Sequence, residues 1–254
     1  MYSYGEMPVV VYEPCGDGEK HGNFLDASYR AILRNPEWNR RLGKIHTNAA
    51  RSLPRNDRRW RELDSCMSSD ALLMNVFCHP GTLRTSNVCS MLGVQPGESP
   101  LFGFRARVPL VNGRADRTEV DMKLGGLLVE SKLTESGFQC QAEDLVESYL
   151  GLRDVFECRR LTKVRDRYVS YQLIRNVLAA HVLGLSFCVI LDARRPDLRE
   201  AWFTIMTCVR SSELRTRCQV LTWQELSGRL PRELQRFLQN KYGIEPPRLS
   251  VAAK

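Results

Sequence analysis

The chain has 254 residues, of which 43% are hydrophobic and 26% are charged, a composition typical of globular proteins that excludes intrinsic disorder. This length suits a single α/β domain with peripheral additions. The 37 lysines and arginines exceed the 29 aspartates and glutamates, and the formal net charge is +8. Such a balance favours polyanionic partners.

The sequence has no apolar stretch near the roughly 20 residues that a membrane-spanning helix needs, and its first residues do not resemble a signal peptide. Its nine cysteines are scattered without a Cys-x-x-Cys pair, which indicates reduced thiols. We therefore expect a protein of the reducing cytoplasm that has no membrane partner.

Helical spacing of apolar residues predicts helices over residues 23–34, 36–46 and 57–78. We therefore expect residues 1–100 to form a mainly helical part. It would pack on a core made by residues 101–254, and the two parts would form one compact domain.

From residue 101 the hydrophobic period changes to two, and apolar side chains alternate up to residue 108. A turn at residues 112–113 follows, and then two strands over 117–124 and 127–133 are joined by Gly125 and Gly126. This pattern predicts an antiparallel meander of three strands.

Beyond the meander, the pattern predicts a helical region through residue 157 and a helix over 169–182. Buried strands are expected over residues 185–193 and 201–209, and closing helices over 221–226 and from Pro231 onward. The whole order predicts an α/β fold with a mixed central sheet flanked by helices.

If Gly125 and Gly126 form a two-residue hairpin loop, residues whose numbers sum to 251 lie opposite each other. Asp121 then faces Glu130, and Glu119 faces Lys132. These four side chains share one face of the hairpin, because side chains alternate along a strand. The other face carries Val120, Met122, Leu124, Leu127, Val129 and Leu133.

Two opposed carboxylates repel each other unless a cation lies between them. The oxygens of Asp121 and Glu130 suit Mg²⁺ or Mn²⁺ as ligands. Lys132 would then hold or help deprotonate an attacking water and stabilise charge on a phosphate. The alternative is an exposed hairpin with a Glu119–Lys132 salt bridge, which leaves the opposed acids unexplained.

This arrangement resembles the PD-(D/E)XK nuclease superfamily, in which a carboxylate on one strand precedes a (D/E)xK motif on the next. Asp121 matches the first acid, and Glu130, Ser131 and Lys132 match the motif. The resemblance implies a restriction-endonuclease-like fold, divalent-metal catalysis and cleavage of nucleic acid. It also implies that the peptide carbonyl of Ser131 ligates metal.

Several branches of the superfamily carry a Gln-x-x-x-Tyr motif on the helix after the ExK strand. Gln172 matches the glutamine, whereas Asn176 stands at the tyrosine position. Gln172, Arg175 and Asn176 form a polar stripe on an otherwise apolar helix. We expect Gln172 to act at the catalytic site and Asn176 to be accessory, with a structural hydrogen-bonding role as the alternative.

Superfamily members also add an acid from a helix that precedes the strands, which makes Glu62 and Asp70 candidate accessory residues beside Glu119. Capping or solvated roles are the alternative for Glu62 and Asp70. Candidate nucleic-acid contacts are Arg58, Arg59, Arg175 and Arg194.

These features predict a metal-dependent endonuclease or exonuclease that hydrolyses DNA in defence, repair or a mobile element. An RNase, or a catalytically silent module that binds nucleic acid, is the alternative. No helix-turn-helix or zinc finger is evident. A homodimer or a partner subunit that supplies specificity therefore stays open.

Overall fold

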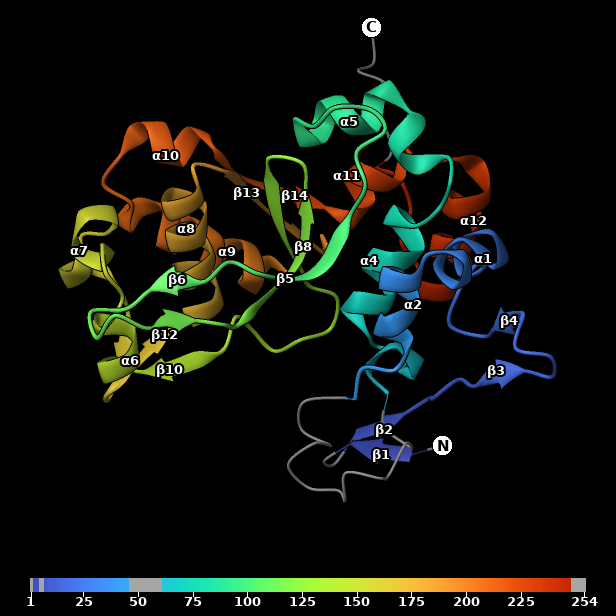
Figure 1. The fold of residues 1–254 in the computed structure, drawn as a ribbon, viewed down its shortest axis with the longest axis horizontal. Helices are drawn as coiled ribbons and strands as arrows, with labels where there is room; N and C mark the ends of the chain where they lie inside the picture. Colours follow the sequence, from blue (N-terminus) through green and yellow to red (C-terminus); the bar gives the residue numbers. More distant parts are fainter. Residues whose placement is uncertain (1, 5–6, 46–60, 248–254) are drawn as a thin grey trace, which may run out of the picture. The chain divides into compact units, whose positions relative to one another are not determined.

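The computed structural model describes residues 2–4, 7–45 and 61–247 (Figure 1). Two compact units make up the chain, which we call unit 1 and unit 2. Unit 1 comprises Met1–Met91, Gln95–Pro100 and Gln224–Lys254, and unit 2 comprises Leu92–Val94 and Leu101–Trp223. Within the described ranges, no helix is both long and apolar enough to span a bilayer.

Unit 2 is built on a five-stranded mixed sheet with the strand order β14-β13-β9-β8-β5. The strands are β5 (Leu101–Arg105), β8 (Glu119–Leu124), β9 (Leu127–Ser131), β13 (Ser186–Leu191) and β14 (Cys218–Thr222). The first three strands pair antiparallel as the predicted meander, and β13 runs parallel to both β9 and β14. The predicted mixed α/β sheet is confirmed.

The β8–β9 hairpin turns at Gly125 and Gly126, and Gly125 has the positive φ of 53° that the turn requires. Met122 pairs with Val129, and Leu124 pairs with Leu127. The numbers of these paired residues sum to 251, so the predicted register is correct in this part of the hairpin.

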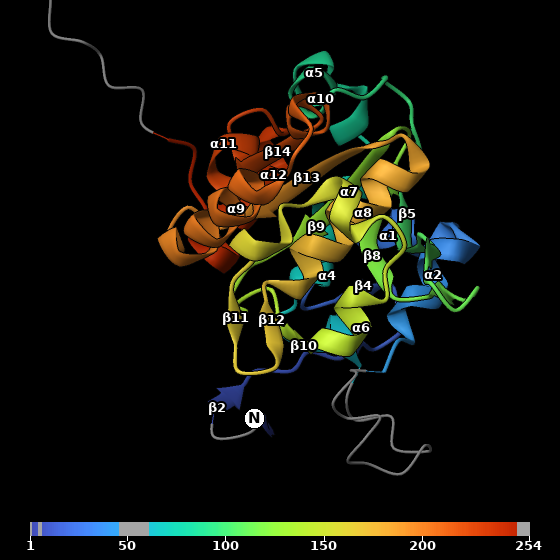
Figure 2. The same ribbon diagram turned by 90° about the vertical axis from the view of Figure 1, so that its left-hand side faces the viewer.

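Helix α8 (Tyr171–Leu183) packs against β9 and β13, as the two ribbon views show (Figures 1 and 2). All residues of the central strand β9 are buried. The buried part of α8 includes two polar residues, Arg175 and Asn176. A buried polar group needs a hydrogen-bond partner, so we expect both side chains to be hydrogen-bonded inside the protein.

Short elements complete unit 2. The strands β6 (Val108–Pro109) and β7 (Ala115–Asp116) pair with each other, and β10 (Cys140–Ala142), β12 (Arg167–Val169) and β11 (Lys163–Val164) form a three-stranded sheet. The helices are α6 (Glu143–Glu147), α7 (Leu152–Val155), η3 (Cys158–Arg160), α9 (Pro196–Cys208) and α10 (Ser212–Thr216). The region before residue 157 is therefore only partly helical, contrary to the prediction.

Unit 1 is mainly helical where it is described. Its helices are α1 (Asp26–Arg34), α2 (Pro36–Leu42), η1 (Glu62–Asp64), α4 (Ser69–Phe77), η2 (Thr82–Arg84), α5 (Ser86–Leu92), α11 (Trp223–Ser227) and α12 (Arg232–Tyr242), the first residue of α11 and the last of α5 belonging to unit 2. Its short strands are β1 (Tyr2–Tyr4), β2 (Met7–Val9), β3 (Pro14–Cys15) and β4 (Lys20–His21).

The expected strand over residues 201–209 is wrong, because this segment belongs to helix α9. The buried residues of α9 are Leu198, Trp202, Ile205 and Cys208, and they recur every three or four residues along one helical face. Pro196 also suits the first turn of a helix. The helical period becomes visible only when the residues before 201 are included.

The expected helix over residues 57–78 is confirmed only over its last part, where α4 lies, and not as one continuous helix. Residues 57–60 lie outside the described residues, and η1 and α4 are separate elements. The Ser68 hydroxyl accepts a hydrogen bond from the amide of Ala71, so it caps α4 and ends the preceding segment. Strand β14 was not predicted, and the helix expected over 221–226 begins after it, at Trp223.

Candidate active site

A buried ion pair lies at the end of β9. The Glu130 side chain is fully buried and Lys132 is 5% exposed, and Lys132 Nζ donates to Glu130 Oε1 at 2.7 Å. Burial by itself lowers the pKa of Lys132, but the nearby carboxylates of Glu130, Asp121 and Glu135 outweigh it and raise that pKa. Lys132 is therefore charged at neutral pH.

Asp121 comes to this pair from the neighbouring strand β8. Its carboxylate is partly buried, and Oδ2 accepts a hydrogen bond from the amide of Ser131 at 2.7 Å. The backbone pairing of the hairpin ends at Met122 and Val129, so the strands are linked here by a side chain. The first acid of the predicted motif is thus bonded to the strand that carries the second.

Helix α8 supplies a further contact to Glu130. Asn176 Nδ2 donates to Glu130 Oε2 at 2.8 Å. The Asn176 carbonyl oxygen in turn accepts from Nε and Nη2 of Arg175 at 3.1 and 2.9 Å. Arg175 Nη2 also donates to the carbonyl of Glu119 at 2.8 Å. Arg175 and Asn176 therefore link β8 to the buried carboxylate of Glu130.

Gln172 lies one turn before Asn176 on α8. Its side-chain oxygen Oε1 is shielded from solvent and has no hydrogen-bond partner among the described residues. Its backbone amide donates to the carbonyl of Phe138 at 3.0 Å. The direct polar contact from α8 to Glu130 is made by Asn176, so the catalytic role of Gln172 stays a prediction.

The partners of Glu119 and Lys132 differ from those expected from the register. Glu119 lies 3.5 Å from Nη2 of Arg105 on β5, and Lys132 pairs with Glu130, two residues before it. A side chain of β9 therefore holds the lysine, and the hairpin does not need the Glu119–Lys132 bridge of the alternative interpretation.

The donor set suits a hard divalent cation. Asp121, Glu130 and the carbonyl of Ser131 offer only oxygen ligands, which Mg²⁺ and Mn²⁺ prefer. Both oxygens of Glu130 accept hydrogen bonds, but each has a second lone pair. No group of three or more His, Cys, Asp or Glu side chains in the described ranges could hold a metal. Waters would complete the shell, as is usual for Mg²⁺.

Glu62 and Asp70 belong to unit 1, where they form an ion cluster with two cations. Lys44 Nζ lies 2.8 Å from Glu62 Oε2, and Arg41 Nη2 lies 2.9 Å from Asp70 Oδ2. Burial, followed by the nearby charge of Asp70, raises the pKa of Glu62. Their accessory role in catalysis stays a prediction.

The remaining candidate arginines fall into two groups. Arg58 and Arg59 lie outside the described residues. The Arg194 guanidinium pairs with the buried carboxylate of Asp192, two residues before it. A phosphate would therefore compete with Asp192 for Arg194.

Sequence reasoning missed Trp223 as a neighbour of the site. Its side chain is fully buried, and its indole Nε1 donates to the carbonyl of Lys132 at 3.1 Å. The two residues are 91 positions apart in the sequence. No short sequence motif joins Trp223 to Lys132. The contact depends on the parallel pairing of β13 and β14, in which Leu191 lies opposite Thr222.

Comparison with known proteins identifies the family of this chain. The family described as Restriction Endonuclease associating with ARP matches residues 2–243, which is nearly the whole chain. No curated protein and no solved structure matches the chain. The mixed sheet with its helices is that of a restriction-endonuclease-like PD-(D/E)XK fold. The chain therefore belongs to the family of restriction endonucleases associating with ARP.

Proposed function

We propose that this nuclease-family chain hydrolyses phosphodiester bonds of DNA with Mg²⁺ or Mn²⁺ at Asp121, Glu130 and Lys132. The observation that carries the proposal is the buried Glu130–Lys132 pair beside Asp121. The membership in a restriction endonuclease family supports nuclease activity in general and DNA as the substrate class.

The burial of Glu130 and Lys132 supports a functional reading of the pair. Removing two charges from water costs several kcal/mol per ion, and replacing such a pair by apolar residues is often neutral or stabilising. Stability alone therefore gives little reason for a buried lysine and glutamate at the end of a core strand. Catalytic sites commonly contain charges in such environments.

In this proposal, Asp121, Glu130 and the Ser131 carbonyl would hold the metal. When bound, the ion supplies Lewis-acid stabilisation and lowers the pKa of its water. The Lys132 ammonium orients the attacking water and stabilises negative charge on the phosphate. Asn176 keeps the Glu130 carboxylate in place through its 2.8 Å hydrogen bond.

The test is a cleavage panel with the full-length protein. Single-stranded, duplex and branched DNA, together with RNA, are incubated with Mg²⁺, Mn²⁺ or EDTA. We expect products from DNA only with metal, and none above background with Lys132→Met, which keeps the length of the side chain. The matched control is Lys123→Met, because Lys123 lies on β8 in the same hairpin. Undiminished cleavage by Lys132→Met would contradict the proposed mechanism.

The same panel tests the two alternatives. Cleavage of RNA alone would make the protein an RNase. Salt-dependent binding of nucleic acid without turnover would favour a catalytically silent module. Because the family description names an association with ARP, we further propose that a partner subunit supplies the sequence specificity. A sequence-specific cut by the chain alone would contradict that role of a partner.

A further inference from the structure

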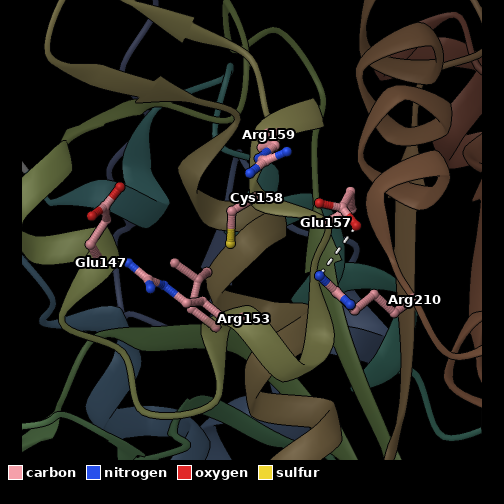
Figure 3. A pocket seen from close by; sticks show the side chains of 7 residues that line it. Glu147, Arg153, Glu157, Cys158, Arg159 and Arg210 are labelled. Carbon is pink, nitrogen blue, oxygen red and sulfur yellow. Dashed lines mark ion pairs between the residues drawn. The ribbon is translucent and has the colours of Figure 1, made fainter.

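A pocket outside the site of Asp121, Glu130 and Lys132 lies in unit 2, and we call it the arginine pocket (Figure 3). Its volume is about 340 Å³, within the range of small-molecule pockets. Its polar and sulfur-bearing lining residues are Glu147, Arg153, Glu157, Cys158, Arg159 and Arg210. They come from the end of α6, from α7 and η3 together with Glu157 between these two helices, and from the segment after α9.

Backbone hydrogen bonds hold the wall that carries Arg210. The amide of Glu157 donates to the carbonyl of Cys208 at 2.8 Å, and the amide of Arg210 donates to the carbonyl of Val155 at 2.9 Å. The guanidinium Nε of Arg210 also donates to the carbonyl of Phe156 at 3.1 Å. These bonds join the two segments that form the wall, so the pocket is preformed.

The two acids of the pocket already have cationic or hydroxyl partners. Glu157 pairs with Arg210 at 3.2 Å (Figure 3). Glu147 accepts from Lys163 at 3.2 Å and from the Tyr168 hydroxyl at 2.9 Å. Neither acid therefore needs another arginine to balance its charge.

Two arginines of the pocket lack such partners. In the part of the chain that the structure describes, the side chains of Arg153 and Arg159 make no hydrogen bond and no ion pair. Figure 3 shows Cys158 between them. Burial raises the pKa of the Cys158 thiol, so this group is neutral at physiological pH and supplies no counter-charge. Both arginines are exposed, so their guanidinium groups are open to an anion from solution.

We propose that the arginine pocket binds a phosphate group through Arg153 and Arg159. A guanidinium presents its N–H donors in a planar fork that matches phosphate oxygens in pairs. The phosphate comes either from the DNA backbone or from a free nucleotide. The first source rests on the proposed function, because it makes the pocket a second contact for the DNA that the nuclease cleaves.

The first experiment asks whether phosphate reaches these two arginines. The wild-type protein in EDTA is treated with phenylglyoxal, which modifies accessible arginines, and the modification of each arginine is followed by peptide mass spectrometry. The additions are inorganic phosphate, dAMP, a short duplex DNA and chloride at equal ionic strength. Arg199 and Arg215 serve as controls, because both are exposed arginines of unit 2 that do not line the pocket.

We expect phosphate-bearing additions to slow the modification of Arg153 and Arg159 several-fold relative to Arg199 and Arg215, while chloride has no such effect. Protection by DNA but not by dAMP identifies the backbone as the source, and protection by dAMP but not by DNA identifies a free nucleotide. Equal modification of all four arginines under every addition overturns the proposal.

The second experiment measures the contribution of the pocket to DNA binding without metal. The double variant Arg153→Gln/Arg159→Gln is compared with Arg199→Gln/Arg215→Gln, which removes the same charge. If the backbone is the source, the slope of log K against log salt falls by about 1 in the first variant only, because one phosphate contact is lost. Equal slopes exclude the backbone as the source. Because cleavage is absent in EDTA, this result is independent of the proposed nuclease activity.

Discussion

Units 1 and 2 each contain a cluster of buried charges, and the two clusters differ in balance. In unit 1, the acids Glu62 and Asp70 share the cations Arg41 and Lys44. Burial by itself lowers the pKa of Lys44, but Asp70 and Glu62 outweigh it and raise this pKa to about 12. In unit 2, three carboxylates act on the single ammonium of Lys132. The charges of the unit 1 cluster are balanced, whereas the excess of carboxylates in unit 2 calls for a further cation.

The largest effect that follows from this comparison concerns Asp121→Asn. We expect cleavage to fall by about 10³-fold, because a metal ligand is lost. In EDTA the thermal stability should stay the same or rise, because one of the mutually repelling carboxylates is removed. The measurements are single-turnover cleavage and calorimetry. A variant that unfolds without metal would show that the Asp121 charge is structural.

Asp70→Asn should have the opposite signature, because it breaks the balanced cluster of unit 1. We expect the free energy of unfolding to fall by about 3 kcal/mol, since Arg41 and Lys44 lose a buried partner. Urea unfolding measures this loss. The control is Glu37→Gln, which removes the exposed pair with Arg40 and should cost no more than about 0.5 kcal/mol. If cleavage falls while stability is retained, Asp70 is the accessory acid that the superfamily resemblance implies.

The third prediction separates two residues of α8. Asn176→Ala removes the donor to Glu130 Oε2, and we expect metal affinity to fall by about 10- to 100-fold, as is typical when the partner of a metal ligand is lost. Gln172→Ala should lower the metal affinity less than Asn176→Ala does, because Asn176 makes the contact to Glu130. Both variants are compared by titrating Mg²⁺ against the cleavage rate. A larger loss of metal affinity with Gln172→Ala than with Asn176→Ala would show that Gln172 acts at the site, as the family motif implies.

The sequence predicted the hairpin because its register depends on local geometry. The two glycines fix the loop, and the alternation of side chains then fixes which residues share a face. The sequence predicted that the central sheet is mixed, but it did not predict strand β14 or helix α9. An apolar run of nine residues such as 201–209 is compatible with either a strand or a buried helix.

The partners of the site residues were less predictable, because they depend on contacts between distant segments. The bond from Asn176 to Glu130 spans 46 residues, and that from Trp223 to Lys132 spans 91. The polar stripe on α8 indicated that a polar partner exists, but it did not distinguish Gln172 from Asn176. The arginine pocket had no sequence signal, because its lining residues come from separate segments of the chain.

The smallest predicted effect concerns Asp116, whose charge lies near Arg175. Burial by itself raises the pKa of Asp116, but hydrogen bonds from Thr118 and Tyr149 outweigh it and lower this pKa. The resulting stability is present above the unfolded pKa of about 3.9 and is lost as the pH falls through the folded pKa. We expect Asp116→Asn to lower the free energy of unfolding by about 1 to 2 kcal/mol at pH 7, and the difference from wild type to shrink below pH 4. Urea unfolding between pH 7 and pH 3 measures it, and a difference that persists unchanged at pH 3 would show that packing, rather than the carboxylate charge, accounts for the loss.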